Sequence, residues 1–199
     1  MPRVSQQYKD ERRREIVAAA SRCFLEHGFE GASMHRIIAA TGLSAGALYN
    51  HFPSKHELVL ESARTALDRV LDPAEGADED ADPRGGGPAE WVAGLLERLA
   101  ADPAATRLLL ITWGGAVSEP ALAAVAGEHL GRVRDRVEGR YGRWAVEELG
   151  LDPERAREWV AMFAQAILSV LQGYVVQSCL LPGFDHDAYL DYARTLAAQ

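Results

Sequence analysis

Two very short helices joined by a glycine turn are the feature that most constrains the fold of this 199-residue chain. The first helix is expected over 34–40, where Ser33 can cap it and apolar residues recur at helical spacing. Gly42 supplies the positive φ that a tight turn needs, and Ser44 can cap a second helix over 45–51. Helices of about two turns are not stable by propensity alone and need a specific packing partner. The pattern therefore predicts a helix-turn-helix, which places its second helix in a DNA groove, in preference to the amphipathic hairpin of an ordinary all-α domain.

The outward-facing residues of this unit are the candidate DNA contacts. Ala45 and Gly46 lack hydrogen-bonding side chains, so base reading is expected to depend on Tyr49 and Asn50. An asparagine side chain pairs well with the N6/N7 edge of adenine. Phosphate contacts are expected from the free N–H groups at the start of the first short helix and from Ser33, Arg36, Tyr49, His51 and Lys55. The expected DNA-binding set is completed by Met34, His35 and Ser44.

A wider pattern surrounds the two short helices. It consists of a first helix with one apolar face and a glycine exit, the two short helices, and the start of the next helix: Ile16, Ala20, Phe24, Gly28, Phe29, residues 33–42, residues 48–55 and Leu58. Together these spacings resemble the tetracycline-repressor (TetR) family of bacterial transcription regulators over roughly residues 10–60. The sequence departs from the family at Ile38, where a small residue is usual, and at Ala45, where a polar or basic residue is frequent. The second departure removes one candidate base contact.

The charge of the chain is divided between its two parts. The net charge of −8 is unexpected for a DNA-binding protein, but residues 1–58 hold 8 Lys or Arg against 6 Asp or Glu, which is +2. Residues 59–199 hold 13 against 23, which is −10. Phosphate binding needs only a local positive face, which can be formed by Arg3, Lys9, Arg12, Arg13, Arg14, Arg36 and Lys55. The acidic remainder argues against a nucleoid-type DNA-packaging protein.

Other classes of protein lack support in the sequence. The six histidines are scattered, and the sequence has no catalytic, metal-binding or nucleotide-binding motif, so no enzyme activity, metal or cofactor is expected. The triplet 185–187 (Asp-His-Asp) can cap a helix or lie on the surface more readily than bind a metal. No apolar run approaches about 18 residues and no signal-peptide pattern opens the chain. The expected location is therefore the cytoplasm, without membrane contact.

Proline, glycine and capping residues divide the whole chain into helical segments. We expect an all-α fold of about nine helices, the first beginning at residue 7 or 10 and ending at 27, and the others over 34–40, 45–51, 55–71, 88–101, 103–117, 120–149, 153–181 and from 186 onward. Glycines 127, 131, 139 and 142 make 120–149 the helix most open to interruption. The expected domains are a three-helix DNA-binding domain over 1–54 and a helical ligand-binding and dimerisation domain over 55–199. A flexible acidic loop is expected over 72–87.

The helix over 153–181 is apolar nearly all round and must be covered on more than one side. The family resemblance implies a cover: a second copy of the chain, with the last two helices of each protomer forming a four-helix bundle. An intramolecular core helix is the alternative. The residues expected at the dimer interface are Phe163, Ile167, Val170, Leu171, Tyr174, Ser178, Tyr189, Tyr192 and Leu196.

The resemblance also implies a small-molecule pocket in the second domain, where a bound ligand moves the helix over 55–71. Candidate lining residues are Trp91, Leu95, Leu99, Leu110, Trp113, Met162, Phe163 and Gln165, with the pair Gly114-Gly115 leaving room beside Trp113. Ordinary core packing is the alternative for these side chains. They include no charged cluster, so the effector is expected to be apolar or aromatic. The sequence thus predicts a homodimeric repressor that leaves a pseudo-palindromic operator in double-stranded DNA when an effector binds; a transcriptional activator or a ligand-independent DNA-binding dimer is the alternative.

Overall fold

The structure is a computed structural model that describes residues 6–71 and 87–197. Within these residues the chain forms nine helices and no strand, which confirms the predicted all-α fold. The loop expected over 72–87 lies outside the described residues, except for Gly87.

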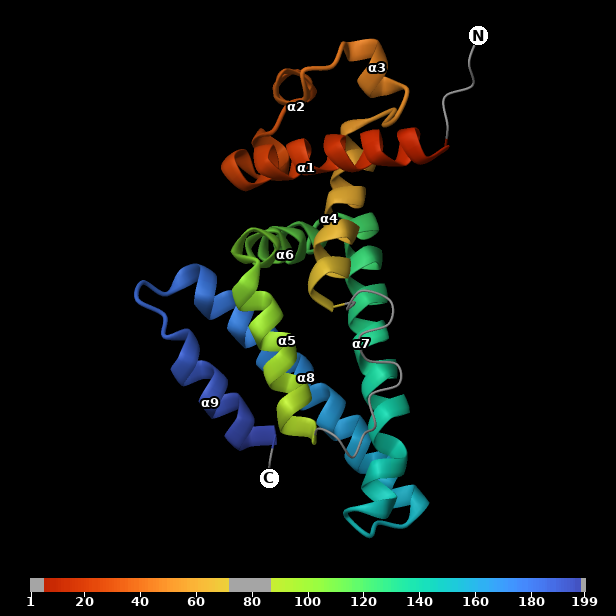
Figure 1. Ribbon diagram of the computed structural model, residues 1–199, viewed down its shortest axis with the longest axis vertical. Helices are drawn as coiled ribbons and strands as arrows, with labels where there is room; N and C mark the ends of the chain where they lie inside the picture. Colours follow the sequence, from red (N-terminus) through yellow and green to blue (C-terminus); the bar gives the residue numbers. More distant parts are fainter. Residues whose placement is uncertain (1–5, 72–86, 198–199) are drawn as a thin grey trace.

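Four helices form the end of the molecule that is uppermost in Figure 1. α1 (Gln6–Gly31) lies across the long axis, and α2 (Met34–Thr41) and α3 (Ala45–Tyr49) lie on its outer side. α4 (Lys55–Leu71) runs from α1 into the rest of the molecule and contacts α5, α6 and α7 there. α4 is therefore shared by both ends.

Five further helices form the second part of the molecule, called the regulatory body after the role that the sequence predicts for it. They are α5 (Pro88–Ala101), α6 (Pro103–Ala116), α7 (Pro120–Glu147), α8 (Pro153–Leu180) and α9 (His186–Ala197). α7 and α8 have 28 residues each, and the turn that joins them lies at the end of the molecule opposite α2 and α3. α9 packs against α5 and α8.

Capping by carboxylates starts three of the body helices where the sequence predicts. Asp102, Glu119 and Asp152 each accept a hydrogen bond from a first-turn backbone N–H, at 2.9, 3.3 and 3.1 Å respectively. A proline follows each of these residues, and its fixed φ suits the first helical position.

α7 runs without interruption from Pro120 to Glu147, although its glycines made it the predicted helix most open to a break. A Cβ atom at any of the glycines 127, 131, 139 and 142 would meet no atom within 4 Å, so no close contact there requires glycine. Each glycine costs about 1 kcal/mol of helix stability relative to alanine. Tertiary packing offsets this cost because one stripe of α7 is buried over its whole length: Leu122, Val125, Ala126, His129, Val133, Val137, Tyr141 and Ala145.

α1 extends beyond its predicted end. Gly28 adopts the predicted left-handed φ of 68°, but a further turn continues to Gly31. The kink carries Phe29 against Phe24, with ring centroids 5.1 Å apart. Phe29 also reaches Gly115 at the end of α6, where an added Cβ would lie 3.5 Å from its ring and 2.8 Å from Leu122. Gly115 therefore makes room for Leu122 and Phe29.

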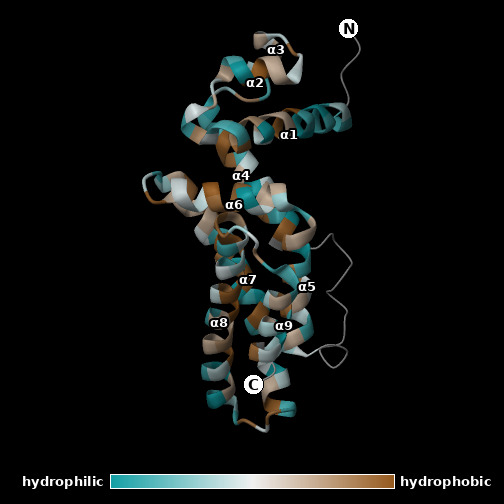
Figure 2. Cartoon of the chain, turned by 90° about the vertical axis from the view of Figure 1, so that its left-hand side faces the viewer, coloured by the Kyte–Doolittle hydropathy of each residue, from teal (hydrophilic) through white to brown (hydrophobic). Residues whose placement is uncertain are grey.

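The buried core is continuous from one end of the molecule to the other. It includes Ile16 and Ile37 near the tip, Leu58 and Leu67 along α4, and Val137 in the body. Figure 2 shows hydrophobic and hydrophilic residues alternating along the body helices, whereas the first turns of α1 are almost entirely hydrophilic. The division into domains at residue 54 stays a prediction.

Candidate nucleic-acid interface and regulatory body

The two short helices are held by caps at both sides of a left-handed turn. The Ser33 hydroxyl accepts a hydrogen bond from the Arg36 N–H at 3.3 Å, and the Ser44 hydroxyl accepts one from Ala47 at 3.2 Å. Gly42 closes α2 with a φ of 67°. Both serines are exposed, so each hydroxyl can still donate its proton to a phosphate. The predicted helix starts and turn are confirmed.

The inner and outer faces of this unit are cleanly separated. Ile37, Leu48 and Phe52 are fully buried. The outer face of α3 exposes Ala45, Gly46, Tyr49 and Asn50, and the exposed fraction of Tyr49 is 45%. Of the other predicted contacts, His35 and Arg36 are exposed, while Met34 and His51 are half-buried. The residues expected to read bases therefore do not contribute to the local core.

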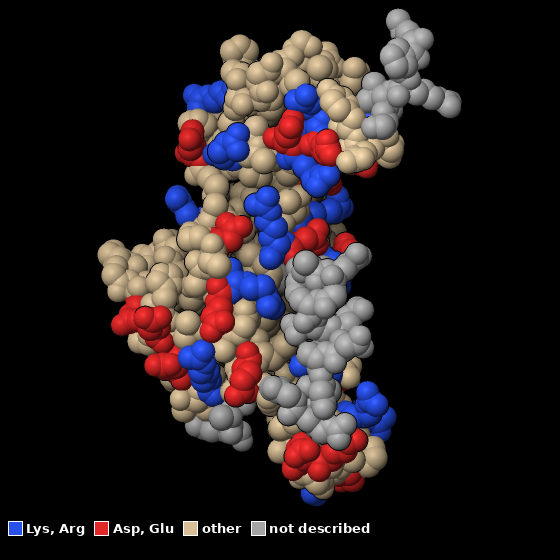
Figure 3. Space-filling view, viewed as in Figure 1, with Lys and Arg blue, Asp and Glu red and all other residues tan. Residues whose placement is uncertain are grey.

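Charge over the short helices favours a polyanion. The sequence has no acidic residue between Glu30 and Glu57. In the view of Figure 3, Asp and Glu side chains begin at the level of α1, and further groups of them lie at the α7–α8 turn and over α9. This agrees with the charge division in the sequence.

Arg13 is not the free phosphate ligand that the sequence suggests. Its guanidinium lies 4.1 Å from the centre of the Phe52 ring and donates hydrogen bonds to the His51 carbonyl oxygen at 3.0 Å and to Glu61 at 3.3 Å. It therefore joins the end of α3 to α1 and α4. Sequence reasoning missed this positioning role because a run of three arginines does not indicate which one turns inward.

The remaining basic residues differ in how many of their hydrogen-bond donors are available to a phosphate. Lys55 donates a hydrogen bond from Nζ to the Glu30 carbonyl oxygen at 3.1 Å, which leaves two of its protons for a phosphate. Arg12 is paired with Glu15 at 2.6 Å. Arg36 makes no side-chain hydrogen bond or ion pair to the described residues. Arg3 lies outside them.

A polar contact links α4 to α7. The buried ring of His129 lies with Nδ1 2.8 Å from the Val125 carbonyl oxygen and Nε2 2.9 Å from the Asp68 carboxylate. Arg132 donates to the same Asp68 oxygen at 2.8 Å. Burial alone would raise the pKa of Asp68, but the hydrogen bonds from Arg132 and His129 outweigh it and hold the pKa below its ordinary value. The contact fixes the lower part of α4 against the regulatory body.

The predicted effector-lining residues do not form one pocket. Leu99 and Trp113 line a cavity of only about 10 Å³ between α5, α6, α7 and α8. Leu95 is fully buried and Leu110 is partly buried against the core. Met162 and Gln165 lie on the exposed face of α8, and the exposed fraction of Met162 is 68%. Both therefore point away from the interior of the protomer, and their place in an effector pocket stays a prediction.

The other two candidates belong to an aromatic cluster near the α7–α8 turn. The fully buried Tyr141 ring contacts Trp91 at 6.1 Å, Trp144 at 6.0 Å and Phe163 at 5.6 Å between centroids. Trp159 stacks on Phe163 at 4.8 Å. Here the core interpretation fits the structure better than a pocket.

Several predicted dimer residues are used within the protomer. Ile167, Leu171 and Tyr174 are buried, with exposed fractions of 2%, 4% and 0%. Tyr189 donates a hydrogen bond to the Val170 carbonyl oxygen at 2.8 Å. Phe163, Val170 and Ser178 are half-buried, so of the nine residues only Tyr192 and Leu196 are exposed.

The apolar residues that remain exposed on α8 and α9 form a different set. It consists of Met162, Val176, Leu180, Leu181, Tyr192 and Leu196. The periodicity of α8 showed that the helix needs cover on more than one side, but not which stripe the protomer itself covers. By length and composition α8 could also cross a membrane, with 33% of its most apolar window buried. Gln165 and Gln177 on the exposed side do not suit such a span.

Comparisons with known proteins agree with this architecture. Residues 16–62 match the family described as bacterial regulatory proteins, tetR family. The HTH-type transcriptional repressor AcnR of Corynebacterium diphtheriae is 43% identical over 72 residues, which are 36% of this chain and 38% of that protein. The matched segment thus spans about two fifths of the length of this curated relative.

Two solved structures are similar over nearly the whole chain. A transcriptional regulator from Pseudomonas aeruginosa PAO1 has a TM-score of 0.74 and 26% identity, covering 94% of this chain and 88% of that one. A TetR transcription regulator from Haloarcula marismortui has a TM-score of 0.76 at 19% identity, covering 95% of both chains, and shows the shared fold. The helix-turn-helix end of the chain therefore matches the tetR family of bacterial regulatory proteins, and the chain as a whole has the fold of these solved regulators.

Proposed function

We propose that this protein is a sequence-specific DNA-binding regulator of transcription, and that it acts as a homodimeric repressor. The observation that carries the proposal is the outer face of α3. It exposes Ala45, Gly46, Tyr49 and Asn50, lies in a segment without acidic residues, and contributes nothing to the core. The name of the Corynebacterium diphtheriae relative, a transcriptional repressor, supports the direction of regulation.

Selection from a pool of random duplex DNA tests this function. The full chain is expected to enrich a pseudo-palindrome whose half-sites lie about one helical turn or somewhat more apart, because a two-fold dimer presents two α3 helices on one face of the duplex. No enrichment beyond that obtained with an Asn50→Ala, Tyr49→Ala double variant would contradict it. An operator that overlaps the promoter supports repression, whereas one upstream of the promoter supports activation.

The dimer interface is the exposed apolar set on α8 and α9. Two copies related by a two-fold axis would cover it, since each presents the same surface. Leu180→Glu is expected to make the protein monomeric in sedimentation equilibrium. Val117→Glu is the matched control, because Val117 is 90% exposed at the α6–α7 turn and outside this set. A dimer that persists in Leu180→Glu would place the interface elsewhere.

The effector enters beside Trp113. The Nε1–H of Trp113 is buried without a hydrogen-bond acceptor among the described residues, next to the cavity of about 10 Å³. A buried donor without a partner costs about 1–3 kcal/mol, which a ligand that opens the cavity and accepts this proton would recover. Native mass spectrometry of the freshly purified protein tests for such a ligand, and Trp113→Phe is expected to weaken its binding. Ligand binding that is unchanged in Trp113→Phe would exclude this position.

A further inference from the structure

A large cleft lies outside the effector region, at the junction between the DNA-binding end and the regulatory body. It has a volume of about 670 Å³ and is bounded by α1, α4 and α6. Small-molecule sites in proteins have volumes of about 300–1,000 Å³. The cleft therefore has the size of a ligand site, and neither the DNA contacts nor the cavity beside Trp113 use it.

The lining of the cleft is positively charged. It includes four arginines (Arg13, Arg14, Arg22 and Arg69) against Asp10 and Glu61, a formal balance of +2. One arginine is already committed, because Arg13 holds Glu61 and the end of α3. Asp10 accepts a hydrogen bond from Gln6 at 2.9 Å, which occupies part of that carboxylate. The excess charge thus falls on the other three arginines.

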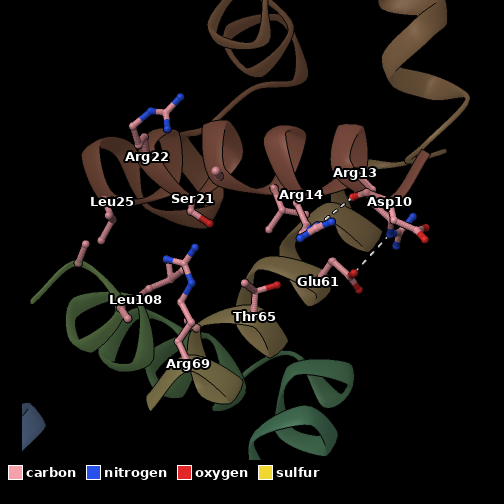
Figure 4. A pocket seen from close by; sticks show the side chains of 15 residues that line it. Asp10, Arg13, Arg14, Ser21, Arg22, Leu25, Glu61, Thr65, Arg69 and Leu108 are labelled. Carbon is pink, nitrogen blue, oxygen red and sulfur yellow. Dashed lines mark hydrogen bonds and ion pairs between the residues drawn. The ribbon is translucent and has the colours of Figure 1, made fainter. Parts of the chain in front are cut away.

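These three guanidinium groups have weak internal partners. Arg14 donates only to the backbone oxygen of Asp10, one turn earlier in its own helix, at 3.4 Å. Arg69 lies 3.7 Å from Asp102, whose other carboxylate oxygen caps α6. Arg22 makes no hydrogen bond or ion pair to the described residues. In Figure 4, Arg14 and Arg69 extend into the space between α1 and α4, whereas the Arg22 side chain points away from it on the other side of α1.

The rest of the lining is apolar, with two hydroxyl groups. Val17, Ala18, Leu25, Ala105 and Leu108 supply apolar surface, and Ser21 and Thr65 supply hydroxyls. Guanidinium groups bind carboxylates strongly through paired N–H donors, whereas the apolar surface favours a hydrocarbon body. A ligand that satisfies both parts is a small organic carboxylate with an aromatic or branched aliphatic body.

We propose that this cleft is a second effector site that is specific for such carboxylates. The bound carboxylate clamps α1 to α4 and α6. Because α1 carries α2 and α3, a ligand held at once by Arg14 on α1 and Arg69 on α4 fixes the angle between the DNA-binding end and the regulatory body. The effect on DNA binding rests on the proposed function above. Binding of the carboxylate itself does not.

Calorimetric titration of the full chain with 2-naphthoate, benzoate and 2-methylbutanoate tests the site, with 2-naphthamide as the uncharged analogue. At least one carboxylate is expected to bind, and the amide is expected to bind about tenfold more weakly or worse because it lacks the charge. Arg14→Gln and Arg69→Gln are each expected to weaken carboxylate binding by about tenfold. Both side chains are exposed, so the fold tolerates the changes. Arg157→Gln, an exposed arginine on α8, is the matched control and is expected to leave binding unchanged.

Absence of binding by all three carboxylates up to millimolar concentration would overturn the proposal. So would binding that Arg14→Gln and Arg69→Gln leave unchanged. A second titration measures operator affinity with and without saturating carboxylate, and a change is expected in the wild-type protein and not in Arg69→Gln. If carboxylates bind but no DNA does, the proposed function fails and the ligand site stands; if DNA binds but no carboxylate does, the opposite holds.

Discussion

The α2–α3 unit and the regulatory body use their side chains in opposite ways. In the α2–α3 unit, the buried Ile37, Leu48 and Phe52 hold the fold, and the candidate contacts Tyr49 and Asn50 face outward. In the regulatory body, several of the side chains that the sequence marks as candidates for ligand or dimer contacts are themselves buried in the core: Leu95, Leu99, Ile167 and Tyr174.

This difference explains where function can be separated from folding. A substitution on the outer face of α3 is expected to change binding without changing stability. A substitution at a buried candidate in the body is expected to change stability first, whatever it does to ligand binding. The following predictions test this division, beginning with the largest expected effect.

Leu99→Ala is expected to reduce the free energy of unfolding by about 2–5 kcal/mol, because the side chain is only 1% exposed and its loss leaves a cavity. Urea denaturation followed by circular dichroism measures the change. Gln165→Ala is the matched control from the same predicted ligand set, and its exposed position should limit the change to about 0.5 kcal/mol. Equal losses of stability in the two variants would show that burial does not decide which substitutions in the regulatory body change folding.

Asn50→Ala is expected to cost about 1–3 kcal/mol of affinity for the selected operator and to relax the preference at one position in each half-site. The Asn50 side chain makes no hydrogen bond to the described residues, so the unfolding transition should not move. Fluorescence anisotropy with operator and random duplexes measures the loss of operator affinity and the change in sequence preference. An equal loss on random DNA would make Asn50 a backbone contact.

Arg13→Gln and Lys55→Ala are expected to weaken DNA binding for different reasons. The Arg13 change removes the bond to His51 and the contact with Phe52, at a cost of about 1–2 kcal/mol in stability, and leaves the salt dependence of binding unchanged. The Lys55 change removes a phosphate contact, so the slope of log K against log salt, near −5 for about six phosphates, should fall in magnitude by about one. Titrations at several salt concentrations distinguish the two. A slope of smaller magnitude in Arg13→Gln would show that Arg13 contacts a phosphate after all.

The smallest expected effect is the pH dependence of the α4–α7 contact. Since the pKa of Asp68 is lower in the folded protein than in the unfolded chain, its ionised form stabilises the fold at neutral pH. That contribution is lost as the pH falls through the folded-state pKa, below the ordinary range for aspartate. The Asp68 side chain is 51% exposed, so solvent screens the interaction and the loss is small. Thermal melts of wild type and Asp68→Asn should converge in acid, and a constant difference at all pH values would exclude this role.

The sequence predicts most of the fold because the signals that start and end its helices are local. Ser33, Ser44, Asp102 and Asp152 cap helices where they are expected, since a cap depends on only a few neighbouring residues. The glycines of α7 do not interrupt the helix, because the packing of its buried stripe is a tertiary effect that outweighs local glycine propensity.

The sequence predicts less of the sites because orientation depends on distant partners. The inward turn of Arg13 depends on Glu61, 48 residues away. The junction cleft joins Arg14 to Arg69, which no spacing rule relates. For α8, hydrophobic periodicity identified a helix with too much apolar surface, but only the packing of α5, α6, α7 and α9 against it determines which side stays exposed.

The central claim is that the outer face of α3 serves DNA binding alone, and Gly46→Leu tests it most directly. A Cβ at Gly46 would meet no atom within 4 Å in the free protein, and leucine favours helix over glycine by about 0.5–1 kcal/mol. The variant is therefore expected to melt at the wild-type temperature or slightly above it. Its affinity for the selected operator is expected to fall by tenfold or more, about 1.4 kcal/mol, because the added side chain occupies the space between α3 and the groove. Wild-type operator affinity in a correctly folded Gly46→Leu protein would show that α3 does not approach DNA and would contradict the account.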